Sequence, residues 1–293
     1  MPQQAERELR ELTRYRSSLV RERTAEINRL QKTLEGANIK LASVASQVTG
    51  VSGRAMLNAL VAGNTDAAAL AQLAKGRLRE KIPQLERALV GQFGPHQSFL
   101  VARQLAHIDF LDDAIEQVSQ EVAQRMGPFE AALEGLDTIP GVGRWTAEVI
   151  VAEIGTDMSH FPSAGHLASW AGMCPGNNES AGKRKSGKTR KGSKWLRVAL
   201  TEAAQAAGRG KGTYLSSQYH RLAARRGKKK AAIAVGHSIL VIAYHILKDH
   251  TTYQELGSDY FDQRQSTRLR TRLVNRLQGL GYDVSLTPLP EAA

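Results

Sequence analysis

The feature that most constrains the fold is a long repeat of apolar residues near the N-terminus. Within residues 6–42 they recur at spacings of three, four, seven and eight, with Arg, Glu and Lys between them. This period predicts one long helix, as in a coiled coil or a helical hairpin. Two interpretations stay open, because the stripe can pack inside its own chain or form the seam of a dimer. The stripe consists of Leu9, Leu12, Leu19, Ile27, Leu30, Leu34 and Leu41.

Helical patterns continue through the rest of the chain. Residues 43–75 are Ala-rich and favour short helices, whereas 76–92 and 96–126 predict two longer ones. Gly127-Pro128 marks a border, because Pro suits the first turn of a new helix. We therefore expect an all-α protein in two parts, a coiled-coil-like helical region at 1–127 and a second domain at 128–293. Four acids share one helical face, which we interpret as solvated rather than metal-binding: Asp109, Asp112, Asp113 and Glu116.

Composition excludes several classes of protein. Hydrophobic residues make up 42% of the 293 residues, which is enough for a packed core. No apolar run reaches the length of a membrane span, and no signal peptide is recognisable. The single cysteine, Cys174, has no partner for an internal disulfide. These features predict a cytoplasmic protein with no membrane partner.

The positive charge is concentrated in one block. The chain has a net charge of +12, yet Lys183–Lys230 alone holds sixteen Lys and Arg and a single acid, Glu202. A solvated surface is the plain interpretation of such a run. The Gly and Ser residues around the cations and the lack of acids favour contact with the phosphates of a nucleic acid.

A glycine-containing turn precedes this block. Ile139-Pro140-Gly141-Val142-Gly143 lies between a short helix and an amphipathic one, and it resembles the helix-hairpin-helix motif of DNA-binding proteins. Gly141 and Gly143 would let the backbone approach a phosphate, at the positive end of the second helix. Arg144 would add a charged contact. The alternative is a tight turn that merely packs two helices.

Two serines lie within a basic loop further along the chain. A helix near 163–171 ends at Gly172, the loop is expected to be irregular from Pro175 onward, and a helix resumes near Lys194. The serines are Ser180 and Ser186. The cations expected to contact nucleic acid are Lys183, Arg184, Lys185, Lys188, Arg190, Lys191, Lys194 and Arg197.

The order of these motifs resembles the C-terminal transposase domain of the insertion-sequence 110 family, which is grouped with 116 and 902. The resemblance rests on the turn at 139–143, on Leu167-Ala168-Ser169-Trp170-Ala171-Gly172, and on Ser180-Ala181-Gly182-Lys183. Arg190-Lys191-Gly192 and the apolar helix at 233–247 also fit. The N-terminal helices resemble the coiled-coil segment of the same family.

The resemblance implies a DNA recombinase with a serine nucleophile. It points to Ser180, with Ser186 as runner-up, and to neighbouring cations that stabilise the charge developing on the phosphate. The implied partners are DNA, a guide RNA encoded by the mobile element, and further copies of the same chain. Members of the family also carry an N-terminal RuvC-like domain whose acids bind Mg²⁺, and this sequence has no matching segment. We therefore expect a shortened family member, for which an active and an inactive protein both stay open, with no cofactor site of its own and Mg²⁺ supplied through the missing domain. The alternative is a non-catalytic DNA- or RNA-binding protein.

Histidines and tyrosines in the C-terminal part are interpreted as packing residues. His237 and His245 lie eight residues apart on the apolar helix, without the ligand spacing of a zinc site. Tyr214, Tyr219 and Tyr244 are alternatives for stacking on nucleic-acid bases, but ordinary packing is favoured.

Overall fold

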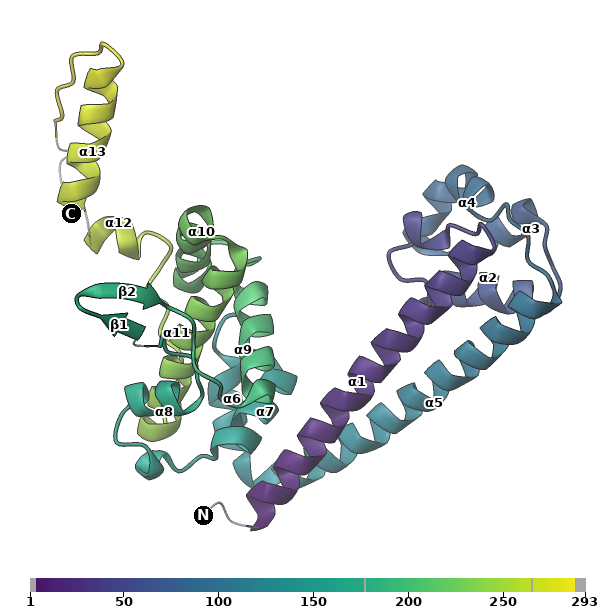
Figure 1. Cartoon of the computed structure of the whole chain (residues 1–293), viewed down its shortest axis with the longest axis horizontal. Helices are drawn as coiled ribbons and strands as arrows, with labels where there is room; N and C mark the ends of the chain where they lie inside the picture. The colour runs from purple at the N-terminus through teal and green to yellow at the C-terminus, as the bar shows by residue number, and fades with distance from the viewer. Residues whose placement is uncertain (1–3, 177, 265, 288–293) are drawn as a thin grey trace. The chain divides into compact units, whose positions relative to one another are not determined.

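A computed structural model describes residues 4–176, 178–264 and 266–287 (Figure 1). Within these residues the fold is helical apart from one two-stranded hairpin, which confirms the all-α prediction. The chain forms two compact units. The first comprises the start of the chain up to Arg10 together with everything from Met126, and the second comprises Glu11–Arg125. The change of unit after Arg125 lies beside Gly127-Pro128.

The second unit is a helical hairpin made by α1 (Gln4–Gly36) and α5 (Pro95–Met126) (Figure 1). Gln104 Nε2 donates to Thr33 Oγ1 over 3.2 Å, and Arg23, which precedes Thr33 in α1, pairs with Asp112, which follows Gln104 in α5, so the two helices run antiparallel. The intervening elements are η1 (Leu41–Ser43), α2 (Val51–Val61), α3 (Ala67–Ala71), η2 (Gly76–Lys81) and α4 (Ile82–Ala88).

Near the C-terminal end of α1, the leucine stripe packs inside its own chain. Leu30 and Leu34 of α1 join one hydrophobic core with Leu57, Leu85 and Val101. The helix predicted to reach residue 42 instead ends at Gly36, because Asn38 turns the chain with a left-handed φ of 60°. A fully buried Leu side chain contributes about 1.5–3 kcal/mol, so these contacts outweigh local propensity.

The acids on α5 form surface ion pairs with neighbouring helices. Asp112 binds Arg23 of α1, and Asp109 binds Arg54 of α2. Among the described residues no three His, Cys, Asp or Glu side chains gather as a metal site. Exposed ion pairs of this kind contribute about 0–1 kcal/mol each, so they tune the surface rather than hold the fold.

The first unit packs its helices around α11 (Lys228–Asp249), which contacts α6, α8, α9 and α10 (Figure 1). By length and composition alone α11 could cross a membrane, but more than half of its most apolar window is buried inside the unit (56%). The other elements are η3 (Gly127–Phe129), α6 (Glu130–Asp137), α7 (Arg144–Ile154), η4 (Met158–His160), α8 (Ala164–Trp170), β1 (Asn178–Ser180), β2 (Lys183–Ser186), α9 (Lys194–Ala207), α10 (Tyr214–Arg226), α12 (Tyr260–Arg264) and α13 (Ser266–Gly279).

Candidate nucleic-acid interface

A tight turn joins α6 to α7 at the glycine motif. The Val142 N–H donates to the Ile139 carbonyl over 2.9 Å, and both side chains are buried, which anchors the turn in the unit. Gly143 is the N-cap of α7, and no side chain caps its first turn. The leading N–H groups of an α-helix lack partners inside the helix, so this end of α7 presents donors suited to an anion.

The two glycines of the turn have different surroundings. Gly141 has a φ of +88°, and a Cβ placed there would lie 2.4 Å from the Ala203 carbonyl oxygen and 2.5 Å from the Ala207 nitrogen of α9. A Cβ at Gly143 would meet nothing within 4 Å. The missing side chain at Gly141 therefore allows close packing on α9, whereas Gly143 leaves open space at the start of α7.

Arg144 is held by carboxylates of its own chain. Its guanidinium makes a two-pronged ion pair with Glu130 and a further contact with Glu148 at 3.2 Å. Hydrogen bonding to Glu130 raises the pKa of Arg144, and the same bond lowers the pKa of Glu130. The positive charge expected to face a phosphate is thus balanced by acids from α6 and α7.

The basic loop is an antiparallel β-hairpin, which we call the basic arm (residues 175–189). Pro175 bridges to Thr189 at its base, and β1 pairs with β2 toward the tip. The prediction of an irregular segment from Pro175 is wrong here. Ala181 and Gly182 have φ values of +50° and +72°, and positive φ at both central residues is the geometry of a two-residue hairpin turn.

Ser180 lies next to the tip of the arm. It is the last residue of β1, is exposed, and pairs with Lys183 across the turn. In the part of the chain that the structure describes, no side chain accepts a hydrogen bond from the Ser180 hydroxyl. Ser186 is half-buried, and its Oγ accepts the Lys188 N–H over 3.1 Å within the arm. The structure therefore presents Ser180 openly and uses Ser186 locally.

Most of the predicted cations are exposed along the arm and at its base. Within the described ranges none of them forms an ion pair with a carboxylate, and the Lys194 ammonium lies 4.8 Å from the Trp195 ring centre. Arg184 and Lys185 belong to β2, but their side chains lie outside the described residues. The exposed cations are Lys183, Lys188, Arg190, Lys191 and Lys194.

Arg197 supports the base of the arm. Its Nη2 donates to the Gly172 carbonyl, to Thr189 Oγ1 over 2.8 Å and to the Arg190 carbonyl over 2.9 Å. This side chain, expected as a phosphate contact, therefore joins the two ends of the arm to α9. All three of these hydrogen bonds come from the same nitrogen of the guanidinium.

A buried carboxylate that the sequence did not single out fixes the start of α9. Ser193 caps this helix by accepting the Leu196 N–H over 3.2 Å, and its hydroxyl donates to Glu153 Oε2 over 2.9 Å. Glu153 is 2% exposed, and Arg10 donates to its carbonyl oxygen over 3.1 Å. The only sign of this contact in the sequence is an acid within an apolar helical segment, because such an acid needs a polar partner once it is buried.

The tyrosines singled out in the sequence make contacts within the unit. Tyr244 is buried and donates its hydroxyl to the Phe161 carbonyl over 3.0 Å. Tyr214 stacks on Phe261 with ring centres 5.1 Å apart, and a Cβ at Gly208 would lie 2.7 Å from the Tyr219 ring. All three tyrosines thus pack against their own chain.

Comparison with known proteins places this region in a family. Residues 133–220 match the family described as Transposase IS116/IS110/IS902. The pilin gene-inverting protein of Moraxella lacunata is 30% identical over 151 residues, which is 49% of this chain and 46% of that protein. The pilin gene-inverting protein of Moraxella bovis is 32% identical over 123 residues, covering 41% and 38%. The chain thus spans less than half the length of these relatives. Residues 133–220 form a transposase domain of the IS116/IS110/IS902 family.

Proposed function

We propose that this chain binds DNA through the basic arm and takes part in DNA rearrangement by attack of Ser180 on a phosphodiester. The observation that carries the proposal is the position of Ser180. Its hydroxyl is exposed next to the tip of an arm whose described cations form no ion pair with a carboxylate, inside the matched transposase domain. The inversion of a gene by the named relatives supports the same class of reaction.

The proposed step exchanges one phosphate ester for another. The Ser180 Oγ forms a bond to phosphorus, and the bond from phosphorus to one neighbouring nucleoside oxygen breaks. The proton lost by the serine ends on that leaving oxygen, which becomes a hydroxyl. Lys183, opposite Ser180, and the other arm cations stabilise the added negative charge as the transition state forms. Attack by the freed hydroxyl on the phosphoserine would restore the DNA strand.

Activation of the serine needs a group beyond the arm. A neutral hydroxyl is a weak nucleophile, and no described side chain is placed to take its proton. The resemblance implies Mg²⁺, but the described residues include no cluster of acids that would hold it. We therefore assign no step to the metal in this chain. We also propose, from the resemblance, a cytoplasmic homo-oligomer that works with a guide RNA.

The test is the formation of a covalent protein–DNA adduct. The unmutated chain, Ser180→Ala and Ser186→Ala are each incubated with a labelled pool of random-sequence duplex DNA, with and without Mg²⁺, and resolved on denaturing gels. We expect an adduct with the unmutated chain and with Ser186→Ala, and none with Ser180→Ala. All three proteins should bind the pool with similar affinity, because the cations are unchanged.

Two results would argue against the proposal. An adduct that persists in Ser180→Ala would reject this nucleophile. If the unmutated chain forms no adduct but binds in a salt-sensitive way, the non-catalytic DNA- or RNA-binding alternative is favoured. The observation in support of that alternative is that no described side chain is placed to activate the Ser180 hydroxyl.

A further inference from the structure

A second concentration of positive charge lies in the other unit, outside the matched domain. We call residues 29–104 the head, because they contain η1, α2, α3, η2 and α4 with the adjoining ends of α1 and α5. The head has ten Lys and Arg and four Asp and Glu, an excess of six positive charges. The remaining residues of this unit, 11–28 and 105–125, have an excess of three negative charges. The positive charge is therefore confined to one end of the hairpin.

Five of the head cations are exposed and unpaired among the described residues. Arg77, Arg79 and Lys81 belong to η2, Arg87 belongs to α4, and Lys75 directly precedes η2. In the described part of the chain none of these five side chains forms an ion pair with a carboxylate. By contrast, Arg23, Arg54 and Arg125 of the same unit each bind an acid. An uncompensated cation attracts a polyanion, whereas a paired one is already neutralised.

Two of the head cations line a cavity of about 360 Å³. Lys40 and Arg87 line it together with the polar side chains of Asn38, Ser43 and Gln84. Lys81 Nζ reaches the carbonyl of Val44, another residue of the same wall, over 3.5 Å. No carboxylate of the described residues lines this cavity, although Lys40 pairs with Glu35 nearby at 3.7 Å. Cations around a hollow that also offers hydroxyl and amide groups suit a phosphate with its attached sugar.

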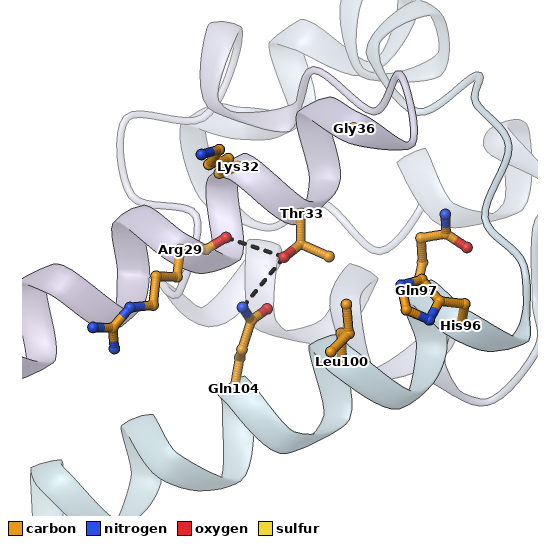
Figure 2. A pocket seen from close by; sticks show the side chains of 8 residues that line it. All are labelled: Arg29, Lys32, Thr33, Gly36, His96, Gln97, Leu100 and Gln104. Atoms are coloured by element: carbon orange, nitrogen blue, oxygen red, sulfur yellow. Dashed lines mark hydrogen bonds between the residues drawn. The ribbon is translucent and has the colours of Figure 1, made fainter.

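A second cavity of about 430 Å³ lies between α1 and α5 in the same head (Figure 2). Lys32 and Arg29 extend from α1, and His96 and Gln97 extend from α5. Its walls also contain no carboxylate among the described residues, although Arg29 pairs with Glu26 nearby at 2.6 Å. The hydrogen bond from Gln104 to Thr33 holds the two helices at this place. The charged side chains that line the two described cavities of the head are thus Lys and Arg in both cases.

We propose that the head binds the phosphate backbone of duplex DNA, as a contact surface additional to the basic arm. The choice of DNA as the polyanion rests on the proposed function. The contacts are with phosphates, so this surface fixes the protein on the duplex without reading its sequence. Each phosphate neutralised on duplex DNA adds about 0.9 to the slope of log affinity against log salt concentration.

The experiment compares two triple variants of the full chain with the same change in charge. The head variant is Arg77→Gln, Arg79→Gln and Arg87→Gln. The control variant is Arg23→Gln, Arg54→Gln and Arg125→Gln, which removes three paired arginines of the same unit. Affinity for a labelled duplex DNA is measured over a range of salt concentrations, and circular dichroism checks that both proteins are folded. Lys75→Gln with Lys81→Gln provides a second head variant.

We expect the head variant to reduce the salt slope by about 2–3 and to weaken binding at low salt by at least about tenfold. The control should keep the slope of the unmutated chain, because its cations are neutralised by acids. Equal slopes for both head variants and the unmutated chain would overturn the proposal. So would a loss confined to a matched RNA duplex, which would assign the surface to RNA. Adduct formation at Ser180 is scored separately, so failure of the proposed chemistry leaves the head result readable.

Discussion

At the scale of single residues, the turn between α6 and α7 offers a matched pair of glycines. Gly141→Ala places a Cβ in a left-handed conformation and against the backbone of α9, so we expect a loss of about 2–4 kcal/mol of stability. Gly143→Ala introduces a side chain into open space at a φ of −104°, so it should lose only the N-cap preference for Gly over Ala, about 0.5–1 kcal/mol. Urea unfolding of both variants measures the difference. Equal losses would contradict the packing of Gly141 on α9.

Arg144 and Arg197 illustrate how far single residues could be assigned from the sequence. Both were expected to contact phosphates, since each lies in or near a basic, glycine-containing segment. Arg144 meets Glu130, which lies fourteen residues earlier, because the turn brings α6 beside the start of α7. Arg197 meets oxygens at both ends of the arm. Such pairings depend on the folded turn and arm, so no spacing in the sequence predicted them.

At the scale of elements, α11 predicts a dependence of stability on pH. Burial lowers the pKa of His237 from its ordinary value of 6.5, so the neutral form is favoured in the folded protein. His237 lines a cavity of about 390 Å³ with Tyr214, His245 and Tyr253. A lowered folded pKa means that the unfolded chain binds the proton more tightly. The stability that depends on neutral His237 is therefore fully present above pH 6.5, and it is lost progressively as the pH falls below that value.

The matching variant is His237→Gln, which cannot take up a proton. We expect the melting temperature of the unmutated chain to fall more steeply between pH 7 and pH 5 than that of the variant. Thermal unfolding followed by circular dichroism at a series of pH values gives both slopes. Identical slopes would show that His237 does not contribute to the acid sensitivity.

Helices and strands differ in how well the sequence predicted them. The helix predicted to resume near Lys194 is α9, which begins at that residue. The arm was missed because Asn178–Ser180 and Lys183–Ser186 contain no β-branched or aromatic residue, so no strand signal is present. Its turn is also unusual, since Ala181 adopts a left-handed conformation that costs an L-residue about 1–2 kcal/mol. We therefore attribute the pairing of the two strands to the base of the arm, where Pro175 forms an antiparallel bridge with Thr189.

At the scale of the whole molecule, two separate units carry excess positive charge. The basic block of the first unit is continuous in sequence, so the sequence alone indicates it. The cations of the head are spread from Arg29 to Arg103 among apolar and polar residues, so no local run indicated them. Only the folding of η2 and α4 beside the 38–44 segment gathers Lys40, Lys81 and Arg87 at one place.

If both surfaces contact the same duplex, their contributions to the salt dependence should add. An arm variant with Lys183→Gln, Lys188→Gln and Lys191→Gln should lower the slope by about 2–3, as the head variant does, because each removes three phosphate contacts. The combined variant should lose the sum of the two reductions. This follows because counterion release is counted per phosphate, wherever on the protein the cation lies. Titration of one labelled duplex with all four proteins over a salt series measures the slopes. A combined loss equal to that of the arm variant alone would mean that the head contributes no contact when the arm is bound, and that only the first unit holds the DNA.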